Sequence, residues 1–259
     1  MATREDILVE LGLTPTWRRR GDALSIPPEA PEVAVANVPE PMRRPEQGAV
    51  SPADNLSRDA RIAALSWDEF AADVDACTAC GLCKTRHKSV PGVGDIRAEW
   101  LFVGEAPGAE EDARGEPFVG QAGRLLDNML AALGMARGRN VYIANVLKCR
   151  PPNNRTPEPF EAAACQPYLA RQVELLRPKL IVALGKSAAT LLLGTEASIA
   201  SLRGRVHQYQ GVPLIVTYHP AYLLRSLPDK AKSWEDMLLA RRTVATSERK
   251  AVTMPPPLV

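Results

Sequence analysis

Short apolar runs alternate with amphipathic stretches along residues 66–259 of this 259-residue chain. Apolar runs bounded by turn residues are typical of buried strands, and apolar residues three to four positions apart are typical of helices. The runs predict strands at 100–103, 141–146, 180–184, 206–209 and 214–218. The helical spacing predicts helices at 122–133, 159–176, 187–193 and 231–243. This alternation indicates an α/β fold in which helices cover both faces of a parallel sheet.

Residues 1–65 follow a different pattern, and we expect no packed core there. Residues 4–12 predict one short helix, and seven prolines lie between Ile26 and Pro52 among few large apolar residues. Such a composition is typical of a disordered linker. Order resumes near Ser66, which can cap a helix that leads to Cys77. The predicted organisation is a Pro-rich N-terminal extension over 1–65, a main domain over 66–246 and a flexible tail over 247–259.

Composition and charge narrow the class of protein. No apolar run approaches the roughly 20 residues of a bilayer span, and the charged first ten residues lack the apolar stretch of a secretory signal. We therefore expect a cytoplasmic protein with no membrane partner. The formal net charge of +2 divides into −2 over 1–65 and +4 over 66–259, a mild basic bias consistent with binding nucleic acid.

The five cysteines favour a metal site over disulfides, because their number is odd and the chain carries no export signal. Cys77 and Cys80 form a C-x2-C pair, Cys149 and Cys165 follow 68 residues later, and Cys83 is left over. A C-x2-C pair places two thiolates on one turn, where they can bind one metal ion or one cluster. Buried free thiols and zinc remain alternatives, although zinc ribbons usually present two such pairs. The spacing indicates a four-thiolate site without naming the metal.

The conspicuous polar motifs all follow predicted strands. A glycine-rich loop at 104–108 follows the first strand, Asn145 lies at the end of the second, and residues 219–225 follow the last. Because ligands bind beyond the carboxyl ends of parallel strands, we expect these motifs to meet at one edge of the sheet. Each motif alone has a structural alternative, such as a tight turn, a capping asparagine or a core phenylalanine at Phe118.

Together the motifs resemble those of a known family. The segments are GEAPG at 104–108 with Glu111 and Asp112, GEPFVGQAG at 115–123, NVLKCRPPNNRTPEP at 145–159 and HPAYLLR at 219–225. In this order, with the cysteine quartet, they resemble the type 4 (family 4) uracil-DNA glycosylases, the iron–sulfur class of that superfamily. The resemblance covers about residues 77–243. It implies a three-layer α/β/α sandwich with a central four-stranded parallel sheet, and excision of uracil from single- or double-stranded DNA, which initiates base excision repair.

The resemblance also implies a [4Fe-4S] cluster. Its ligands would be Cys77, Cys80, Cys149 and Cys165, while Cys83 lies outside the family's quartet. Hydrolysis of a glycosidic bond needs no electron transfer, so we expect the cluster to be structural and to order the segment from Cys149 to Cys165 near the DNA.

The family's substrate-binding residues match positions of this chain. A base inside a duplex must be flipped into a pocket before an enzyme can act on it. By analogy, the amide of Asn145 addresses the 4-carbonyl and N3–H of uracil, and cytosine is rejected because it presents the reverse pattern. Phe118 would stack on the flipped ring, a contact worth about 1–3 kcal/mol. Glu111 would stand against the C5 methyl group that distinguishes thymine.

The chemistry needs donors that stabilise the departing uracil anion, and the resemblance assigns His219 to its 2-carbonyl. Ala106 occupies the position at which other uracil-glycosylase families place an aspartate, so we assign the neighbouring Glu105 to orient water, with bracing of the loop as the alternative. We expect Leu223 to wedge into the DNA stack and Arg225 to contact a phosphate. The alternative for Leu223 is packing against the following helix.

Three rival functions are weighed against this interpretation. A non-catalytic iron–sulfur DNA-binding accessory module would not need Asn145, Phe118 and His219 together. A glycosylase for other deaminated bases, such as hypoxanthine, would be distinguished by which base it releases from a panel of substrates. A related class bonds covalently to the abasic site through a histidine in a basic loop inserted after the second strand. The chain passes from Arg150 to Pro151 without such an insert, so we expect a hydrolytic product.

The remaining expectations concern partners. We expect a monomer that associates with the nucleoid. The acidic, Pro-rich extension suits a tether to a repair or replication protein, with the helix at 4–12 as the docking element, and a dispensable tail is the alternative.

Overall fold

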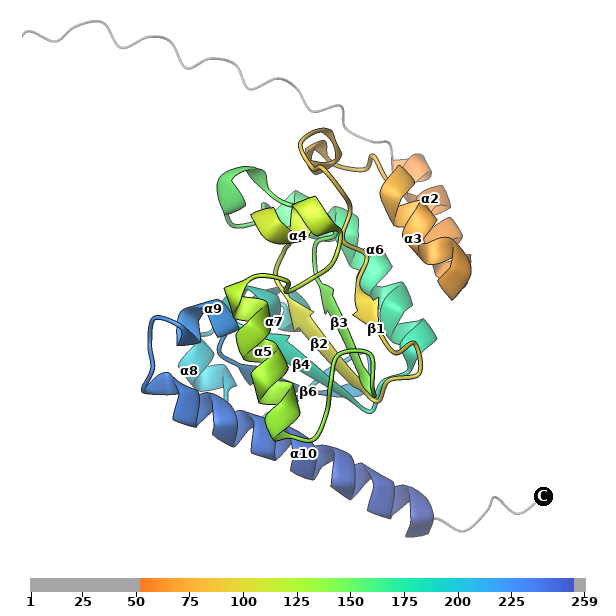
Figure 1. The fold of residues 1–259 in the computed structure, drawn as a ribbon. Helices are drawn as coiled ribbons and strands as arrows, with labels where there is room; N and C mark the ends of the chain where they lie inside the picture. The colour runs from red at the N-terminus through yellow and green to blue at the C-terminus, as the bar shows by residue number, and fades with distance from the viewer. Residues whose placement is uncertain (1–51, 254–259) are drawn as a thin grey trace, which may run out of the picture. The chain divides into compact units, whose positions relative to one another are not determined.

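A six-stranded sheet with the strand order β1-β3-β2-β4-β6-β5 forms the centre of the domain (Figure 1). The computed structural model describes residues 52–253, and side chains over 57–246. The strands are β1 (Val93–Gly94), β2 (Trp100–Gly104), β3 (Val141–Asn145), β4 (Leu180–Leu184), β5 (Val206–Tyr209) and β6 (Val212–Thr217). Strands β3, β2, β4 and β6 are parallel, whereas β1 and β5 pair antiparallel at the two edges. The predicted four-stranded parallel sheet is thus confirmed, with an antiparallel strand added at each edge.

Helices cover both faces of this sheet (Figure 1). The longer helices are α2 (Pro52–Ala64), α3 (Trp67–Ala76), α5 (Gln121–Ala132), α6 (Pro159–Leu176), α7 (Lys186–Leu193) and α10 (Asp229–Thr253). The shorter ones are α4 (Ala109–Arg114), α8 (Ile199–Leu202), α9 (Pro220–Leu223) and two 3-10 helices at Gly81–Lys84 and Pro152–Asn154.

Alternate residues of the central strands enter two separate hydrophobic cores. Leu101 and Val103 of β2 pack in one core with α6, α7 and α8, whereas Trp100 and Phe102 pack in the other with α5 and α10. Successive side chains of a strand point to opposite faces, so a fully apolar strand supplies both cores. The result is the expected α/β/α sandwich.

The carboxyl ends of the parallel strands bring the polar motifs together. Gly104, the last residue of β2, pairs with Asn145, the last residue of β3. On the other side of β2, β4 leads to Gly185 and β6 leads to His219. The loops after these four strands therefore surround one site, as expected for a parallel sheet.

Order begins before the predicted boundary at Ser66. Helix α2 lies within the predicted extension, and its Ile62 is buried in a small core with Phe70 of α3 and Tyr168 of α6. The Pro-rich composition that precedes α2 concealed this short amphipathic helix. At the other end, α10 continues to Thr253, past the predicted start of the tail at 247. The predicted helix at 4–12, the linker from Ile26 to residue 51 and the last six residues lie outside the described residues.

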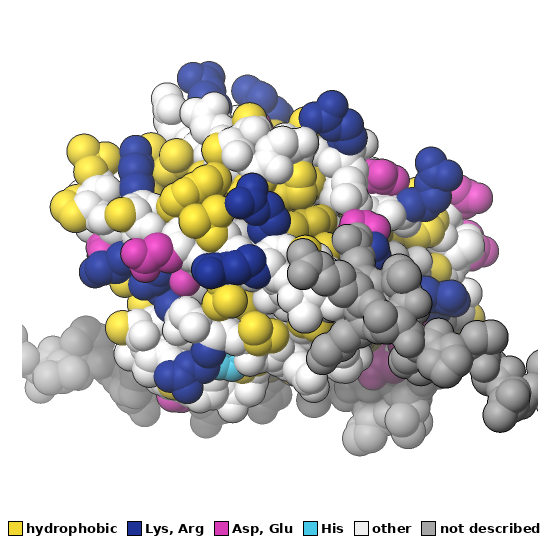
Figure 2. All heavy atoms as spheres, turned by 90° about the horizontal axis from the view of Figure 1, so that it is seen from below, with side chains coloured by type: hydrophobic (Ala, Val, Ile, Leu, Met, Phe, Trp, Pro, Cys, Tyr) yellow, Lys and Arg dark blue, Asp and Glu magenta, His cyan; other side chains and the backbone are white. Residues whose placement is uncertain are grey.

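No helix within residues 52–253 is long and apolar enough to cross a membrane. Figure 2 shows Lys and Arg side chains spread among hydrophobic ones over the face seen from below. The cations on this face are not gathered into one patch, so the basic bias of the sequence does not mark a binding surface there.

Candidate functional site

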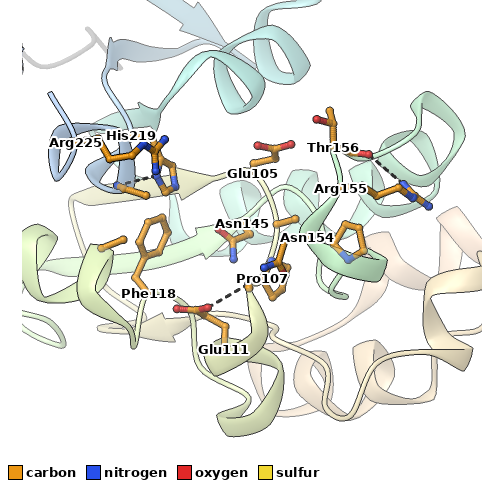
Figure 3. A pocket seen from close by; sticks show the side chains of 15 residues that line it. Glu105, Pro107, Glu111, Phe118, Asn145, Asn154, Arg155, Thr156, His219 and Arg225 are labelled. Carbon is orange, nitrogen blue, oxygen red and sulfur yellow. Dashed lines mark hydrogen bonds between the residues drawn. The ribbon is translucent and has the colours of Figure 1, made fainter. Parts of the chain in front are cut away.

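A cavity of about 540 Å³ lies at the carboxyl ends of the strands (Figure 3). Seven of the predicted site residues line it: Glu105, Ala106, Glu111, Phe118, Asn145, His219 and Arg225. They come from the loop after β2, from α4, from the segment before α5, from the end of β3 and from the segment after β6. The structure therefore brings together the motifs that the sequence separates by more than a hundred residues.

Asn145 presents an unsatisfied acceptor to this cavity. Its side chain is 2% exposed, and its Oδ1 atom has no hydrogen-bond partner among the described residues. Behind it, the buried Lys148 donates from Nζ to the Asn145 carbonyl oxygen at 2.7 Å and to Gln172 Oε1 at 2.5 Å, which fixes the backbone. A buried polar atom without a partner is rare and costly, so Oδ1 is poised for a donor on a ligand.

Phe118 is held in an unusual backbone conformation beside Asn145. Its φ angle is 55°, in the left-handed region that non-glycine residues rarely adopt. Arg137 donates to the carbonyl oxygens of Pro117 and Phe118, both at 2.8 Å, and a Cβ atom on Gly123 would lie 1.7 Å from the Phe118 oxygen. These contacts impose the strain, which turns the ring into the cavity, where it stacks on His219 with centroids 5.5 Å apart.

Glu111 ties two loops of the cavity together. Its Oε2 accepts from the Gly108 N–H at 3.1 Å, and its Oε1 accepts from Val119 at 2.9 Å and Gly120 at 3.3 Å. The carboxylate thus caps α4 and anchors the segment that carries Phe118. The predicted contact with the C5 position of the base stays a prediction.

His219 is a neutral imidazole with a defined tautomer. It caps α9, and its Nδ1 accepts from the Ala221 N–H at 3.1 Å, so the ring proton is on Nε2. Burial, assisted by the charge of Arg225 and opposed by Glu111, lowers the pKa of His219 to about 4. A Cβ atom on Gly185 would lie 2.9 Å from the His219 Cβ, so glycine there allows the loop after β4 to approach.

Glu105 lines the cavity together with Asn145 (Figure 3). Burial raises the pKa of its carboxyl group, and a hydrogen bond with Ser187 opposes that shift. A half-buried carboxylate beside the substrate cavity is suited to accept a proton from water.

The structure buries Leu223, the residue predicted as the DNA wedge. Leu223 is 1% exposed because it lies on the inner side of the single turn α9, whereas Leu224, the residue that ends the turn, is 42% exposed. The neighbouring Arg225 lines the cavity. The sequence could not separate the two leucines, because a one-residue shift on a helix rotates a side chain from the inside to the outside.

Sequence reasoning included the segment 145–159 among the motifs but gave no role to the loop in it that forms the opposite wall. Asn154, Arg155 and Thr156 line the cavity, and Asn154 has a φ angle of 54°. Arg155 is fixed by two bonds to the buried Glu161, at 2.8 and 2.6 Å. The Asn-Asn pair of this loop, which tolerates left-handed backbone, was the available signal. Arg137 carried no signal, because only the tertiary structure brings it to Phe118.

Electrostatic interactions connect the four cysteines of the predicted quartet. Burial raises the pKa of Cys165 to about 12, with a contribution from the nearby Cys149 and Cys80, and burial raises that of Cys149 to about 11, with contributions from Cys80 and Cys77. None of the five cysteines forms a disulfide. Among the described residues, no three His, Cys, Asp or Glu side chains lie close enough to hold a single metal ion.

Two arginines donate to sulfur atoms of this group. Arg86 Nη1 lies 2.8 Å from the Cys149 sulfur, and Arg58 Nη2 lies 3.6 Å from the Cys77 sulfur. Burial raises the pKa of Cys77, but hydrogen bonds from the Ala79 N–H and from Arg58 outweigh it and lower the pKa overall. The thiolate, the form that binds metals, is thus stabilised at Cys77, whereas burial raises the pKa of Cys80, Cys149 and Cys165.

Comparison with known proteins agrees with this geometry. The family model of the uracil DNA glycosylase superfamily matches residues 91–238. A type-4 uracil-DNA glycosylase of Archaeoglobus fulgidus is 47% identical over 167 residues, which are 61% of this chain and 83% of that protein. A type-4 uracil-DNA glycosylase of Thermotoga maritima is 48% identical over 155 residues, 59% of this chain and 80% of that protein. One of Pyrobaculum aerophilum is 45% identical over 171 residues, 63% of this chain and 87% of that protein.

These matches cover the strands, the loops and the cavity described above. The chain belongs to the uracil-DNA glycosylase superfamily and, within it, to the type-4 uracil-DNA glycosylases.

Proposed function

We propose that this DNA glycosylase flips uracil out of DNA into the cavity beside Asn145 and hydrolyses its N-glycosidic bond. The observation that carries the proposal is the buried Asn145 Oδ1, which has no partner among the described residues. Uracil offers an N3–H donor next to its 4-carbonyl acceptor, and one amide can pair with both. Cytosine offers an acceptor and a donor in those places, so it would leave the buried amide unpaired.

Stacking would hold the flipped base in place. The ring of Phe118, fixed by its strained backbone and by Arg137, forms one wall of the cavity. Stacking of a base on an aromatic ring contributes about 1–3 kcal/mol. The rigidity of Phe118 supports a preorganised pocket, which loses little entropy when the base enters.

The leaving group departs as an anion. When the bond between C1′ of the sugar and N1 of uracil breaks, the electron pair stays on uracil and the sugar becomes an oxocarbenium-like cation. The Nε2–H of the neutral His219 is suited to donate to the 2-carbonyl, where negative charge develops. Because the donor is neutral, it stabilises the anion without transferring its proton.

Water completes the reaction. Its oxygen bonds to C1′, and Glu105 is suited to orient it and to accept the proton that it loses. The products are free uracil, which takes up a proton from solvent, and an abasic site.

Contacts with DNA surround the cavity. The exposure of Leu224 supports this residue as the wedge that fills the space left by the flipped nucleotide. Arg225, beside it at the cavity, is suited to bind a backbone phosphate.

We further propose a [4Fe-4S] cluster on Cys77, Cys80, Cys149 and Cys165. The proposal is supported by the two arginines that donate to sulfur, Arg58 to Cys77 and Arg86 to Cys149. When bound, the cluster would link three parts of the chain: the segment after α3, the segment after β3 and helix α6. Iron and sulfide quantification of the purified protein tests it, with the Cys149→Ser variant as a comparison.

The experiment that tests the proposed function is a base panel. Oligonucleotides with a single uracil, hypoxanthine, thymine or cytosine are incubated with the wild type and with His219→Ala, and free base is quantified. We expect release of uracil alone, reduced by roughly 100-fold or more in the variant. Release of hypoxanthine but not uracil would contradict the assignment, and binding without release of any base would favour an accessory DNA-binding module.

A further inference from the structure

Helix α2 reaches the cysteine site from a part of the chain that precedes the family model match. It lies beside α3 and α6 (Figure 1), and the family model match begins only at residue 91. Its Ile62 is fully buried, and the following Leu65 is 8% exposed, in the small core shared with α3 and α6. The helix is therefore docked by apolar contacts onto the elements that carry Cys77 and Cys165.

One side chain of α2 reaches the cysteines. Arg58 Nη2 donates to the Ala164 carbonyl oxygen at 2.8 Å and to the Cys77 sulfur at 3.6 Å. Ala164 precedes Cys165 in α6, so a single guanidinium nitrogen links the segments of two of the four cysteines. The Arg58 side chain is 14% exposed, which shields these bonds from water.

A ring of contacts fixes the position of Arg58. Its guanidinium carbon lies 5.2 Å from the centroid of the Tyr168 ring, one helical turn after Ala164. The Tyr168 hydroxyl donates to Asp73 Oδ1 at 2.6 Å, and Arg61 of α2 forms an ion pair with the same carboxylate. The planar guanidinium is thus held both by its stacking on the ring and by its hydrogen bonds.

We propose that α2 is a clamp that closes the cysteine site, with Arg58 as the residue that fixes Cys77 and screens its sulfur. This inference rests on the proposed cluster. Groups that donate hydrogen bonds to coordinating sulfurs orient these ligands and adjust the properties of the metal site. Loss of such a group commonly lowers metal affinity or activity by about 10–100-fold. Arg86 occupies the corresponding position on Cys149, so a cation stands at two of the four sulfurs.

The charge of the site explains why arginine is needed. A cluster with four thiolates carries net negative charge, and a buried charge is costly unless it is paired and hydrogen-bonded. Arg58 is a positioning residue, because it lies on the cysteines and does not line the substrate cavity. Its loss is therefore expected to shorten the lifetime of the cluster without changing the excision rate of protein that still holds the cluster.

The test compares full-length variants purified without oxygen. Arg58→Gln removes the charge and the stacking, and Arg58→Lys retains the charge but lacks the planar fork. The matched control is Arg97→Gln, which removes the same charge from an exposed position before β2, away from α2. Iron and sulfide per chain, circular dichroism and the decay of the visible absorbance of the cluster in air are measured, followed by the initial rate of uracil excision.

We expect the cluster of Arg58→Gln to decay roughly tenfold faster than that of the wild type, with Arg58→Lys in between and Arg97→Gln unchanged. Equal decay of Arg58→Gln and the wild type overturns the inference but leaves the cluster in place. A wild type without iron and sulfide overturns the cluster and the inference with it. If Arg58→Gln does not fold, Arg58→Lys decides, and decay at the wild-type rate overturns the proposal.

Discussion

Gly104→Ala tests whether the close packing of Gly104, Asn145 and Phe118 sets the geometry of the substrate cavity. A Cβ atom at Gly104 would lie 2.4 Å from Asn145 Oδ1 and 2.6 Å from Phe118 Cζ. Ordinary contacts of a Cβ atom begin at about 3.4 Å, so the new methyl group must displace the amide and the ring by 0.8 to 1.0 Å. Both groups are held from behind, Asn145 through Lys148 and Phe118 through Arg137.

The size of the effect follows from this displacement. A misplacement of about 1 Å at a reacting centre costs on the order of 100-fold in rate. Overpacking of a rigid site also destabilises the fold by about 1–3 kcal/mol, which is small enough for the protein to remain folded. We therefore expect a folded variant whose kcat/KM for uracil excision is about 100-fold lower.

The assay is single-turnover release of uracil from an oligonucleotide, with a thermal melt of each protein. Gly81→Ala is the control, because a Cβ atom there would meet no described atom within 4 Å and the variant should match the wild type. An excision rate of Gly104→Ala equal to that of the wild type would refute the argument that this contact positions Asn145 and Phe118.

Four further predictions follow from the site. Because burial lowers the pKa of His219 to about 4, its ¹⁵N NMR signals should indicate a neutral Nε2–H tautomer at neutral pH and titrate near pH 4; a charged ring at pH 6 would contradict this. Since the unfolded chain binds this proton below about pH 6.5, His219 should also make the wild type lose stability as the pH falls from 6.5 to 4. Leu224→Ala should slow excision from double-stranded DNA more than from single-stranded DNA without changing the melting temperature, whereas Leu223→Ala should destabilise the fold by about 2–5 kcal/mol; equal melting temperatures would contradict the burial of Leu223. Arg137→Met should lower kcat/KM roughly tenfold in the wild type but hardly at all in a Phe118→Ala background, and equal effects in both backgrounds would show that Arg137 does not act through Phe118.

The central sheet was predictable because its strands are short continuous apolar runs. The predicted bounds of β4 and of α6 coincide with those of the structure. For α6, the signal includes Pro159 at its first position and Pro178 just beyond its end. The convergence of Asn145 and His219 followed from topology alone, because both residues come directly after strands of one parallel sheet.

The remaining features depend on tertiary contacts that leave little local signal. β1 has two residues and α9 a single turn, too short for any periodicity. The contact of Arg58 with Cys77 spans nineteen positions and depends on the docking of α2. The burial of Leu223 depends on how α9 packs, which composition and spacing do not encode.

The measurement that tests the account most directly is single-turnover release of uracil by Asn145→Ala beside the wild type, with iron and sulfide quantified in both proteins. Removal of the buried amide should lower the release rate by roughly 100-fold or more while the metal content and melting temperature are retained. Release at the wild-type rate would contradict the claim that the unpartnered oxygen of Asn145 recognises uracil.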